Sequence, residues 1–570
     1  MAAHDMVVRG GVVIDGNGGP ARTADVAVDG DRITEVGRVS GSGRREIDAD
    51  GAIVAPGFVD IHTHYDGQAT WDSRLQPSSW HGVTTVVMGN CGVGFAPALP
   101  EHHDRLIELM EGVEDIPGIA LHEGLAWNWL DFDQYLDALD ALPHDVDFGT
   151  QVPHAALRVH AMGQRAAAHE EATAEEIELM AALAKAAVQA GALGFSTSRT
   201  LNHKSIGGEL IPSYAAGADE LVAIATAIGE TGTGVLQLVS DFPEPVEEFA
   251  LLRRMVAESG RPLSVTLLQF PHDVGLHRRI LRMLEQAWAD GLPIRGQVAA
   301  RSVGLILGLA NTLNPFMTNP VWQRIGHLPA AEQAARMADP TLRSEILAAH
   351  TREKDRSRLG GNFIQRYQLM YELTDPPDYE PPTSESVAAR AGRDGIDPAE
   401  LAYDILADGG MLYLTSMNYA DGNLDEVHDM LVHPHTVPGL SDGGAHVGTI
   451  CDGSFPTTLI QHWTRDRAGA KLELPFVVRR QSRDTARAVG LLDRGVLEPG
   501  YRADLNVIDV DRMRLHRPEV WHDLPAGGRR MVQRADGYLH TVVAGQETYT
   551  DGKPTDALPG RLIRGPQPAP

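Results

Sequence analysis

The segment GFVDIHTHYD, residues 57–66, decides the fold because an apolar strand in it ends with two histidines. A strand turns successive side chains to opposite faces, so His62 and His64 point to the same side. After Pro56 the chain changes from short alternating runs to apolar strands that are each followed by an amphipathic helix. This alternation is typical of βα units around a parallel sheet. The sequence therefore predicts an α/β fold in which this strand opens a parallel barrel.

Nine apolar runs are candidate strands, one more than an eight-stranded barrel needs. They are residues 57–62, 84–88, 146–152, 192–197, 234–239, 263–268, 294–299, 411–415 and 436–440. The helices between them carry clear start signals. Thr173 and Glu176 form a capping box, and Asp397 followed by Pro398 opens a helix that stops at glycine.

The two ends of the chain differ from the middle. Residues 1–55 and 491–570 are rich in short β patterns, and the simplest geometry joins them into one β domain around a barrel of residues 56–490. Residues 311–396 are polar, helical and too long for a plain connection, so we expect a helical insertion or lid there. The final PGRLIRGPQPAP, residues 559–570, is expected to be a surface arm.

The charge balance limits the partners. The 570 residues include 49 Lys and Arg against 77 Asp and Glu, a formal charge of -28. Such a field repels phosphate backbones and anionic lipid, so neither nucleic acid nor a membrane surface is an expected partner. Two cysteines and the lack of a long apolar leader fit a cytoplasmic protein. The oligomeric state, a homo-oligomer included, stays open.

Three motifs point to a metal site. The strand that carries His62 and His64 ends at the mouth of a barrel, where paired imidazoles suit Zn²⁺. Cys91, in TTVVMGNCGVG, follows the second strand, and Asp442, in PGLSDGGAH, follows the last one. Each has a plainer reading: structural histidines, a small buried hydrophobe and an ordinary turn. The strand count, however, brings all of them to one end of the barrel.

Five segments in this order resemble the amidohydrolase superfamily, and the one with NCG resembles its N-acyl-D-amino-acid deacylase (D-aminoacylase) branch. They are APGFVDIHTHYD, GVTTVVMGNCGVGFAP, GALGFSTS, GLSDGGAH and GLLDRGVLEPGYRADLNVID. The resemblance implies a distorted (β/α)8 TIM barrel with a small β-sandwich from both termini, and zinc-dependent hydrolysis of an amide C–N bond. It also implies that His62 and His64 are metal ligands, that Cys91 is a bridging thiolate and that Asp442 is the carboxylate of strand 8.

The sequence departs from this branch on strands 5 and 6. The family has a histidine on each, whereas the corresponding stretches here read GVLQLVSDF and LSVTLLQF, with Gln237 and Gln269 as the nearest polar residues. Amides are poor zinc ligands. We therefore expect one Zn²⁺ rather than two, held by His62, His64, Asp442 and Cys91. The histidines that could substitute for the missing ones are His154, His203 and His446.

The predicted activity is metal-dependent hydrolysis of a small-molecule amide, with Asp442 as proton shuttle. His154 or His203 could help to hold the oxyanion. Arg199 and Arg301 follow strands and could bind a substrate carboxylate, although a salt bridge within this acidic protein is an equal reading. Two alternatives remain: a cyclic-amide hydrolase of the dihydropyrimidinase kind, and a metal-poor scaffold that binds a small molecule without turnover.

Overall fold

Eight parallel strands form the central sheet of the computed structural model, which describes residues 2–350 and 364–570. In barrel order they are β6 (Phe58–Asp60), β7 (Val83–Met88), β8 (Asp147–Pro153), β9 (Gly194–Arg199), β10 (Val235–Ser240), β11 (Leu263–Thr266), β12 (Ile294–Val298) and β16 (Thr436–Pro438). All eight coincide with candidate strands of the sequence. The predicted α/β barrel fold is thus confirmed.

The segments that follow β6 and β16 close the barrel. Thr63 and Gly443 form a parallel bridge. The amide of His64 donates to the carbonyl of Gly443 at 2.8 Å, and the amide of Asp442 donates to the carbonyl of His62 at 3.0 Å. The first and last strands therefore meet at the residues that the sequence selects for chemistry.

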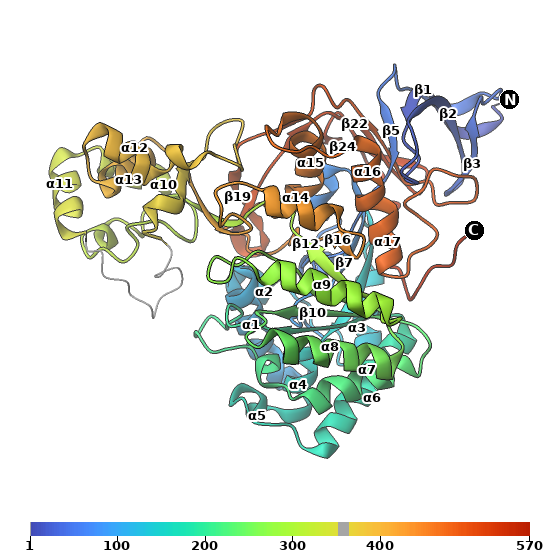
Figure 1. The fold of residues 1–570 in the computed structure, drawn as a ribbon, viewed down its shortest axis with the longest axis horizontal. Helices are drawn as coiled ribbons and strands as arrows, with labels where there is room; N and C mark the ends of the chain where they lie inside the picture. Colours follow the sequence, from blue (N-terminus) through green and yellow to red (C-terminus); the bar gives the residue numbers. More distant parts are fainter. Residues whose placement is uncertain (1, 351–363) are drawn as a thin grey trace.

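Helices cover the outside of the sheet (Figure 1). They are α1 (His103–Glu114), α2 (Gly118–Gly124), α3 (Phe132–Asp140), α4 (His154–Met162), α5 (Gln164–Ala167), α6 (Ala174–Ala190), α7 (Ala218–Gly229), α8 (Pro245–Ser259), α9 (Leu276–Ala289), α14 (Asp425–Val432), α15 (Phe455–Ile460), α16 (Leu474–Arg479) and α17 (Thr485–Ala488). The capping box of Thr173 and Glu176 is present at the start of α6. None of the helices in the described part of the chain combines the length and the hydropathy that a membrane span needs.

The insertion between β12 and β16 is larger than predicted. It contains β13 (Val303–Leu307), α10 (Ala330–Met337), α11 (Pro340–Ala349), β14 (Met370–Glu372), α12 (Val387–Asp394), α13 (Pro398–Ala407) and β15 (Leu412–Met417). Residues 351–363 of the predicted insertion lie outside the described part. The candidate strand at 411–415 is β15, which pairs with β13 and β14 rather than joining the barrel. The insertion has its own core, in which Phe316 packs edge-on against Tyr403, and it projects to the left in Figure 1.

Strands from both ends of the chain form one nine-stranded sheet. They are β1 (His4–Val13), β2 (Arg22–Asp29), β3 (Arg32–Gly37), β4 (Gly43–Asp48), β5 (Ile53–Pro56), β17 (Leu505–Ile508), β22 (Tyr538–Val543), β23 (Gln546–Thr550) and β24 (Lys553–Pro554). The C-terminal part also forms two separate two-stranded sheets: β18 (Arg514–Leu515) with β21 (Ala535–Asp536), and β19 (Glu519–Leu524) with β20 (Gly528–Val532). Asp147 at the start of β8 ties this region to the barrel, because its buried carboxylate pairs with Arg494 at 2.8 Å and Arg502 at 2.6 Å.

The expectation of a surface arm at the C-terminus is wrong. The amide of Phe148 donates to the carbonyl of Arg561, and the amide of Ile563 donates to the carbonyl of Phe148 at 2.7 Å. Leu562 and Ile563 are 7% and 3% exposed. Residues 560–563 therefore dock against the start of β8 through isolated β-bridges and two buried apolar side chains, whereas the last three residues are exposed.

We predict that Ile563→Ala lowers the free energy of unfolding by about 2–5 kcal/mol, the usual cost of truncating a buried isoleucine. Chemical denaturation of the full chain measures this. Pro568→Ala, in the exposed last three residues, is the control and should change nothing. Equal stability of both variants would mean that the tail does not dock.

Candidate metal centre and active site

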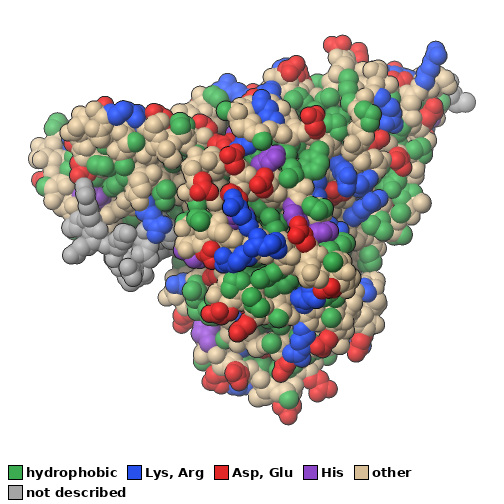
Figure 2. Space-filling model, viewed as in Figure 1, with side chains coloured by type: hydrophobic (Ala, Val, Ile, Leu, Met, Phe, Trp, Pro, Cys, Tyr) green, Lys and Arg blue, Asp and Glu red, His purple; other side chains and the backbone are tan. Residues whose placement is uncertain are grey.

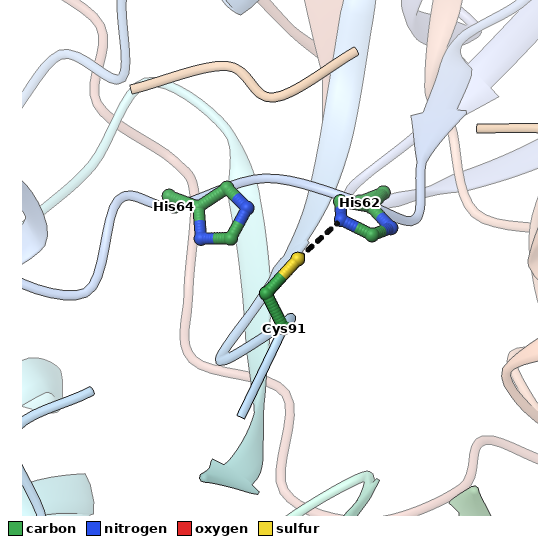
Figure 3. A group of neighbouring side chains, drawn as sticks. All are labelled: His62, His64 and Cys91. Carbon is green, nitrogen blue, oxygen red and sulfur yellow. Dashed lines mark hydrogen bonds between the residues drawn. The ribbon is translucent and has the colours of Figure 1, made fainter. Parts of the chain in front are cut away.

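His62 and His64 follow β6 and point to the same side of the chain, toward Cys91 (Figure 3). Both are 1% exposed. The Nδ1 of His62 lies 2.7 Å from the Oε1 of Gln297 on β12, which accepts its proton. This contact fixes the tautomer and leaves the lone pair of Nε2 directed at the site. Burial lowers the pKa of both histidines, so both imidazoles are neutral and able to bind a metal.

Cys91 lies in the loop after β7, with its backbone in the left-handed region at φ 57°. Its Sγ is 3.2 Å from the Nε2 of His62, and its amide donates to the Oε1 of Gln237 on β10 at 3.1 Å. Burial raises the pKa of the thiol well above its ordinary value, and Glu114 and Asp442 add to this shift. Without a cation the thiol is therefore protonated and donates to His62.

Asp442 completes the group from the loop after β16. Its Oδ1 is 3.3 Å from the Nε2 of His62 and 3.6 Å from the Nε2 of His64. Burial by itself would raise the pKa of Asp442, but His64, His62 and His446 hold it below its ordinary value. The glycine that follows is required by packing, since a Cβ at Gly443 would lie 2.4 Å from the Oγ of Ser78.

The donors fit a cation. His62, His64 and Cys91 each offer one ligand atom, and these atoms lie within 4.8 Å of one another. Ligands of a tetrahedral zinc ion lie about 3.3–3.6 Å apart, given its bond lengths of about 2.0–2.3 Å. The separations of Asp442 from His62 and His64, 3.3 and 3.6 Å, fall in this range, and the 3.2 Å between His62 and Cys91 lies just below it. Both ring nitrogens of His64 and the Oδ1 of Asp442 are buried without a hydrogen-bond partner in the described part of the chain. Buried polar atoms of this kind call for a ligand.

Glu114, the last residue of α1, is a part of the site that the sequence analysis missed. It is 1% exposed, its Oε1 lies 3.2 Å from the Nδ1 of His64, and its Oε2 lies 3.5 Å from the Nε2 of His446. Burial raises its pKa well above the ordinary value, and Asp442 and Asp66 raise it further. Nothing local marks it, because Glu108 and Glu111 precede it on the same helix and no motif distinguishes the three glutamates.

Two of the three substitute histidines lie near this group. His446 has its backbone at φ 48° and contacts Glu114. The Nδ1 of His203 lies 2.8 Å from the Oγ of Ser198, at the end of β9. Burial lowers the pKa of His203 to about 3, and the nearby His446 and His64 contribute, so its imidazole is neutral.

The third histidine, His154, and Gln269 after β11 are engaged elsewhere. His154 contacts Thr197 and Glu220, each at 2.8 Å, in a buried network. The Nε2 of Gln269 donates to the Oδ2 of Asp421 at 2.8 Å, so this side chain holds a loop and cannot replace a metal ligand.

Both arginines that could bind a substrate carboxylate are paired with protein groups. Arg199 donates to Glu248 at 2.7 Å. Arg301 is 1% exposed, pairs with Asp452 at 2.9 Å and lies over the ring of Tyr379. The salt-bridge reading of both residues is therefore the one that the geometry favours.

Sequence comparison identifies relatives along the whole chain. A D-aminoacylase of Alcaligenes xylosoxydans xylosoxydans is 27% identical over 575 residues, which cover 98% of this chain and 97% of the relative. An N-acyl-D-glutamate deacylase of the same organism is 28% identical over 98% of this chain and 96% of its own length. An uncharacterised protein of Mycobacterium tuberculosis is 28% identical over 96% and 92%, respectively.

Solved structures of two deacylases are also similar to this chain along nearly its whole length. A D-aminoacylase studied for its binuclear metal centre superposes with a TM-score of 0.67 at 26% identity, covering 98% of this chain and all of the other. The N-acyl-D-glutamate deacylase of Bordetella bronchiseptica, complexed with zinc and a phosphonate inhibitor, gives a TM-score of 0.64 at 25% identity over 98% and 99%. The model of the amidohydrolase family matches residues 45–549. The chain therefore belongs to the amidohydrolase family.

Proposed function

We propose that this protein is a zinc-dependent hydrolase of linear amides, related in activity to the N-acyl-D-amino-acid deacylases. The observation that carries the proposal is the carboxylate of Asp442, 3.3 Å from His62 and 3.6 Å from His64, beside the thiol of Cys91. The names of the relatives support the substrate class, since both deacylases act on N-acyl-D-amino acids by name.

His62, His64, Cys91 and Asp442 are the residues that would hold one zinc ion. Bound there, the cation would polarise the substrate carbonyl and lower the pKa of a water toward about 7. One ion is the simpler proposal, because Gln237 and Gln269 stand where the related branch has histidines and neither is a good zinc ligand.

Asp442 is the proposed proton shuttle. Its pKa is held below its ordinary value, so it is ionised at neutral pH and can accept a proton from the attacking water. As the C–N bond breaks, Asp442 returns this proton to the leaving nitrogen. Water thus adds its oxygen to the acyl carbon and its proton to the amine.

Gln237 is placed to bind the substrate carbonyl oxygen. Its Oε1 accepts from the amide of Cys91, which leaves the Nε2 as a donor. That Nε2 is buried and has no hydrogen-bond partner among the described residues. A donor directed at developing negative charge stabilises the transition state more than the ground state. His203, neutral and close to His64 and His446, is a second candidate donor.

Glu114 acts through His64. Its Oε1 lies 3.2 Å from the Nδ1 of His64 without forming a regular hydrogen bond, and it would accept the Nδ1 proton once a cation takes the lone pair of Nε2. Carboxylates that orient a metal-binding histidine in this way raise its basicity and fix its tautomer. Glu114 is therefore a positioning residue, not a ligand.

Asp442→Asn should retain zinc, because His62, His64 and Cys91 still offer their ligand atoms, and it should lose turnover by about 10³-fold, because the amide cannot shuttle the proton. The measurement combines elemental analysis with rates on a panel of N-acyl-D-amino acids, N-acyl-L-amino acids, hydantoins and lactams. Near wild-type rates in this variant would refute the assignment. Turnover of hydantoins alone would show a cyclic-amide hydrolase, and turnover of none by zinc-loaded protein would favour a binding scaffold.

Loss of a residue that hydrogen-bonds to a metal ligand weakens metal binding by roughly 10–100-fold. Cys91→Ser removes a ligand itself, so it should weaken zinc binding by more than this. Competition with a chromophoric chelator measures the affinity. Cys451→Ser is the matched control, because Cys451 is also buried but lies near Arg301, outside the donor group. Equal zinc affinities in the two variants would remove Cys91 from the site.

Glu114→Gln should weaken zinc binding by about 10–100-fold, since the amide can present its NH2 rather than an acceptor to His64. Glu108→Gln on the same helix, where the exposed carboxylate pairs with Arg105, should bind zinc normally. A Glu114→Gln protein with wild-type zinc affinity and lower stability only would show that Glu114 is structural.

A further inference from the structure

A cavity of about 390 Å³ lies at the other end of the barrel from the metal site. Arg295 and Thr436 stand at or next to the first residues of β12 and β16, whereas the metal donors follow the last residues of β6, β7 and β16. The charged lining residues are Arg295, Arg479, Arg480, Arg483, Asp484 and Arg487. Figure 2 shows Lys and Arg side chains gathered over the region where α16 and α17 lie in Figure 1.

The positive charge of this cavity is not balanced by the protein. Asp484 is the one carboxylate among the lining residues, and it contacts Arg479 at 3.2 Å and both Arg480 and Arg483 at 3.5 Å. Five guanidinium groups thus face a single acid in a chain whose formal charge is -28. Like charges in such proximity destabilise the fold unless an anion joins them.

Among the described residues, two of the arginines form no ion pair with a carboxylate. Arg295 is half-buried and lies 4.5 Å over the ring of Trp288. Within the described chain, the side chains of Arg295 and Arg487 make no hydrogen bond or ion pair. The Nε of Arg480 is likewise buried without an acceptor in that part of the chain, although its Nη2 donates to the carbonyls of Leu431, His433 and Thr436. The Nε of Arg483 lies 3.5 Å from the Oδ1 of Asp484 without forming a regular hydrogen bond. Guanidinium N–H donors from the strand and the following helices therefore remain available to a ligand.

The backbone around these arginines is unusual. Residues Arg480–Asp484 form a π-helical turn between α16 and α17. Such turns are rare and occur frequently at functional sites. Burial lowers the pKa of Arg480 to about 10, and Asp484 only partly offsets this because Arg295 and Arg479 lower it further. Without a bound anion, the mutual repulsion of these arginines therefore opposes folding.

We propose that this cavity is a binding site for a small phosphate-bearing anion, separate from the active site. Planar guanidinium forks match phosphate oxygens in pairs, and several forks around one cavity favour a group with more than one negative charge. The volume accommodates more than one phosphate or a phosphate with a small organic group. Inorganic phosphate and the phosphate of a metabolite share the chemistry that the site recognises.

Isothermal titration calorimetry of the zinc-loaded full chain with inorganic phosphate, pyrophosphate and adenosine 5′-monophosphate tests this. We expect saturable binding of at least one of them, and the tightest ligand distinguishes a free phosphate from a phosphorylated molecule. Arg295→Gln and Arg487→Gln should each weaken that binding by at least about tenfold, the loss of one charge-assisted contact. Arg254→Gln, which removes an exposed arginine on α8 paired with Glu258, is the matched control and should bind as the wild type does.

Two results would overturn the proposal. One is the absence of saturable heat for all three anions beyond that given by sodium chloride at equal ionic strength. The other is equal affinity in Arg295→Gln, Arg487→Gln and Arg254→Gln. Arg487 is exposed, so its variant tests the site even if Arg295→Gln is unstable.

Discussion

The backbone hydrogen bonds between residues 62–64 and residues 442–443 are the contact on which the rest of the structure depends. They join the first and last strands of the barrel, and they also bring the carboxylate of Asp442 against His62 and His64. A shift of one residue in this register would turn the histidines to the opposite face. The contact that closes the barrel is thus the one that brings Asp442 to the two histidines. These three residues accordingly lie in the segments that follow the strands.

Assembly of the site costs free energy, which packing in the rest of the fold offsets. Cys91, Asp442 and His446 all have left-handed backbones, a conformation that costs about 1–3 kcal/mol each outside glycine. His64 and Glu114 are buried with ring and carboxylate atoms that make no regular hydrogen bond within the described residues. A cation bound among these donors would offset both costs, because it would satisfy the lone pairs and remove the thiol proton.

Local pattern was enough to place the eight barrel strands among nine candidates, and to bring His62, His64, Cys91 and Asp442 to one end of the barrel, because periodicity and strand ends are local properties. Partners distant in sequence were not predictable. Glu114 looks like any helical glutamate until His64 lies beside it. Residues 411–415 were predicted as a barrel strand, and most of them do form a strand, β15, but it pairs with β13 and β14 outside the barrel. Arg301 does follow a strand, but Asp452 and Tyr379 engage it.

The most direct test of the central claim is anomalous diffraction at the zinc edge from crystals of the zinc-loaded protein. The account predicts one strong peak, about 2.0–2.1 Å from the Nε2 of His62 and about 2.3 Å from the Sγ of Cys91. A peak bound by other residues, or none in crystals of protein that hydrolyses amides equally well after chelation, would contradict it.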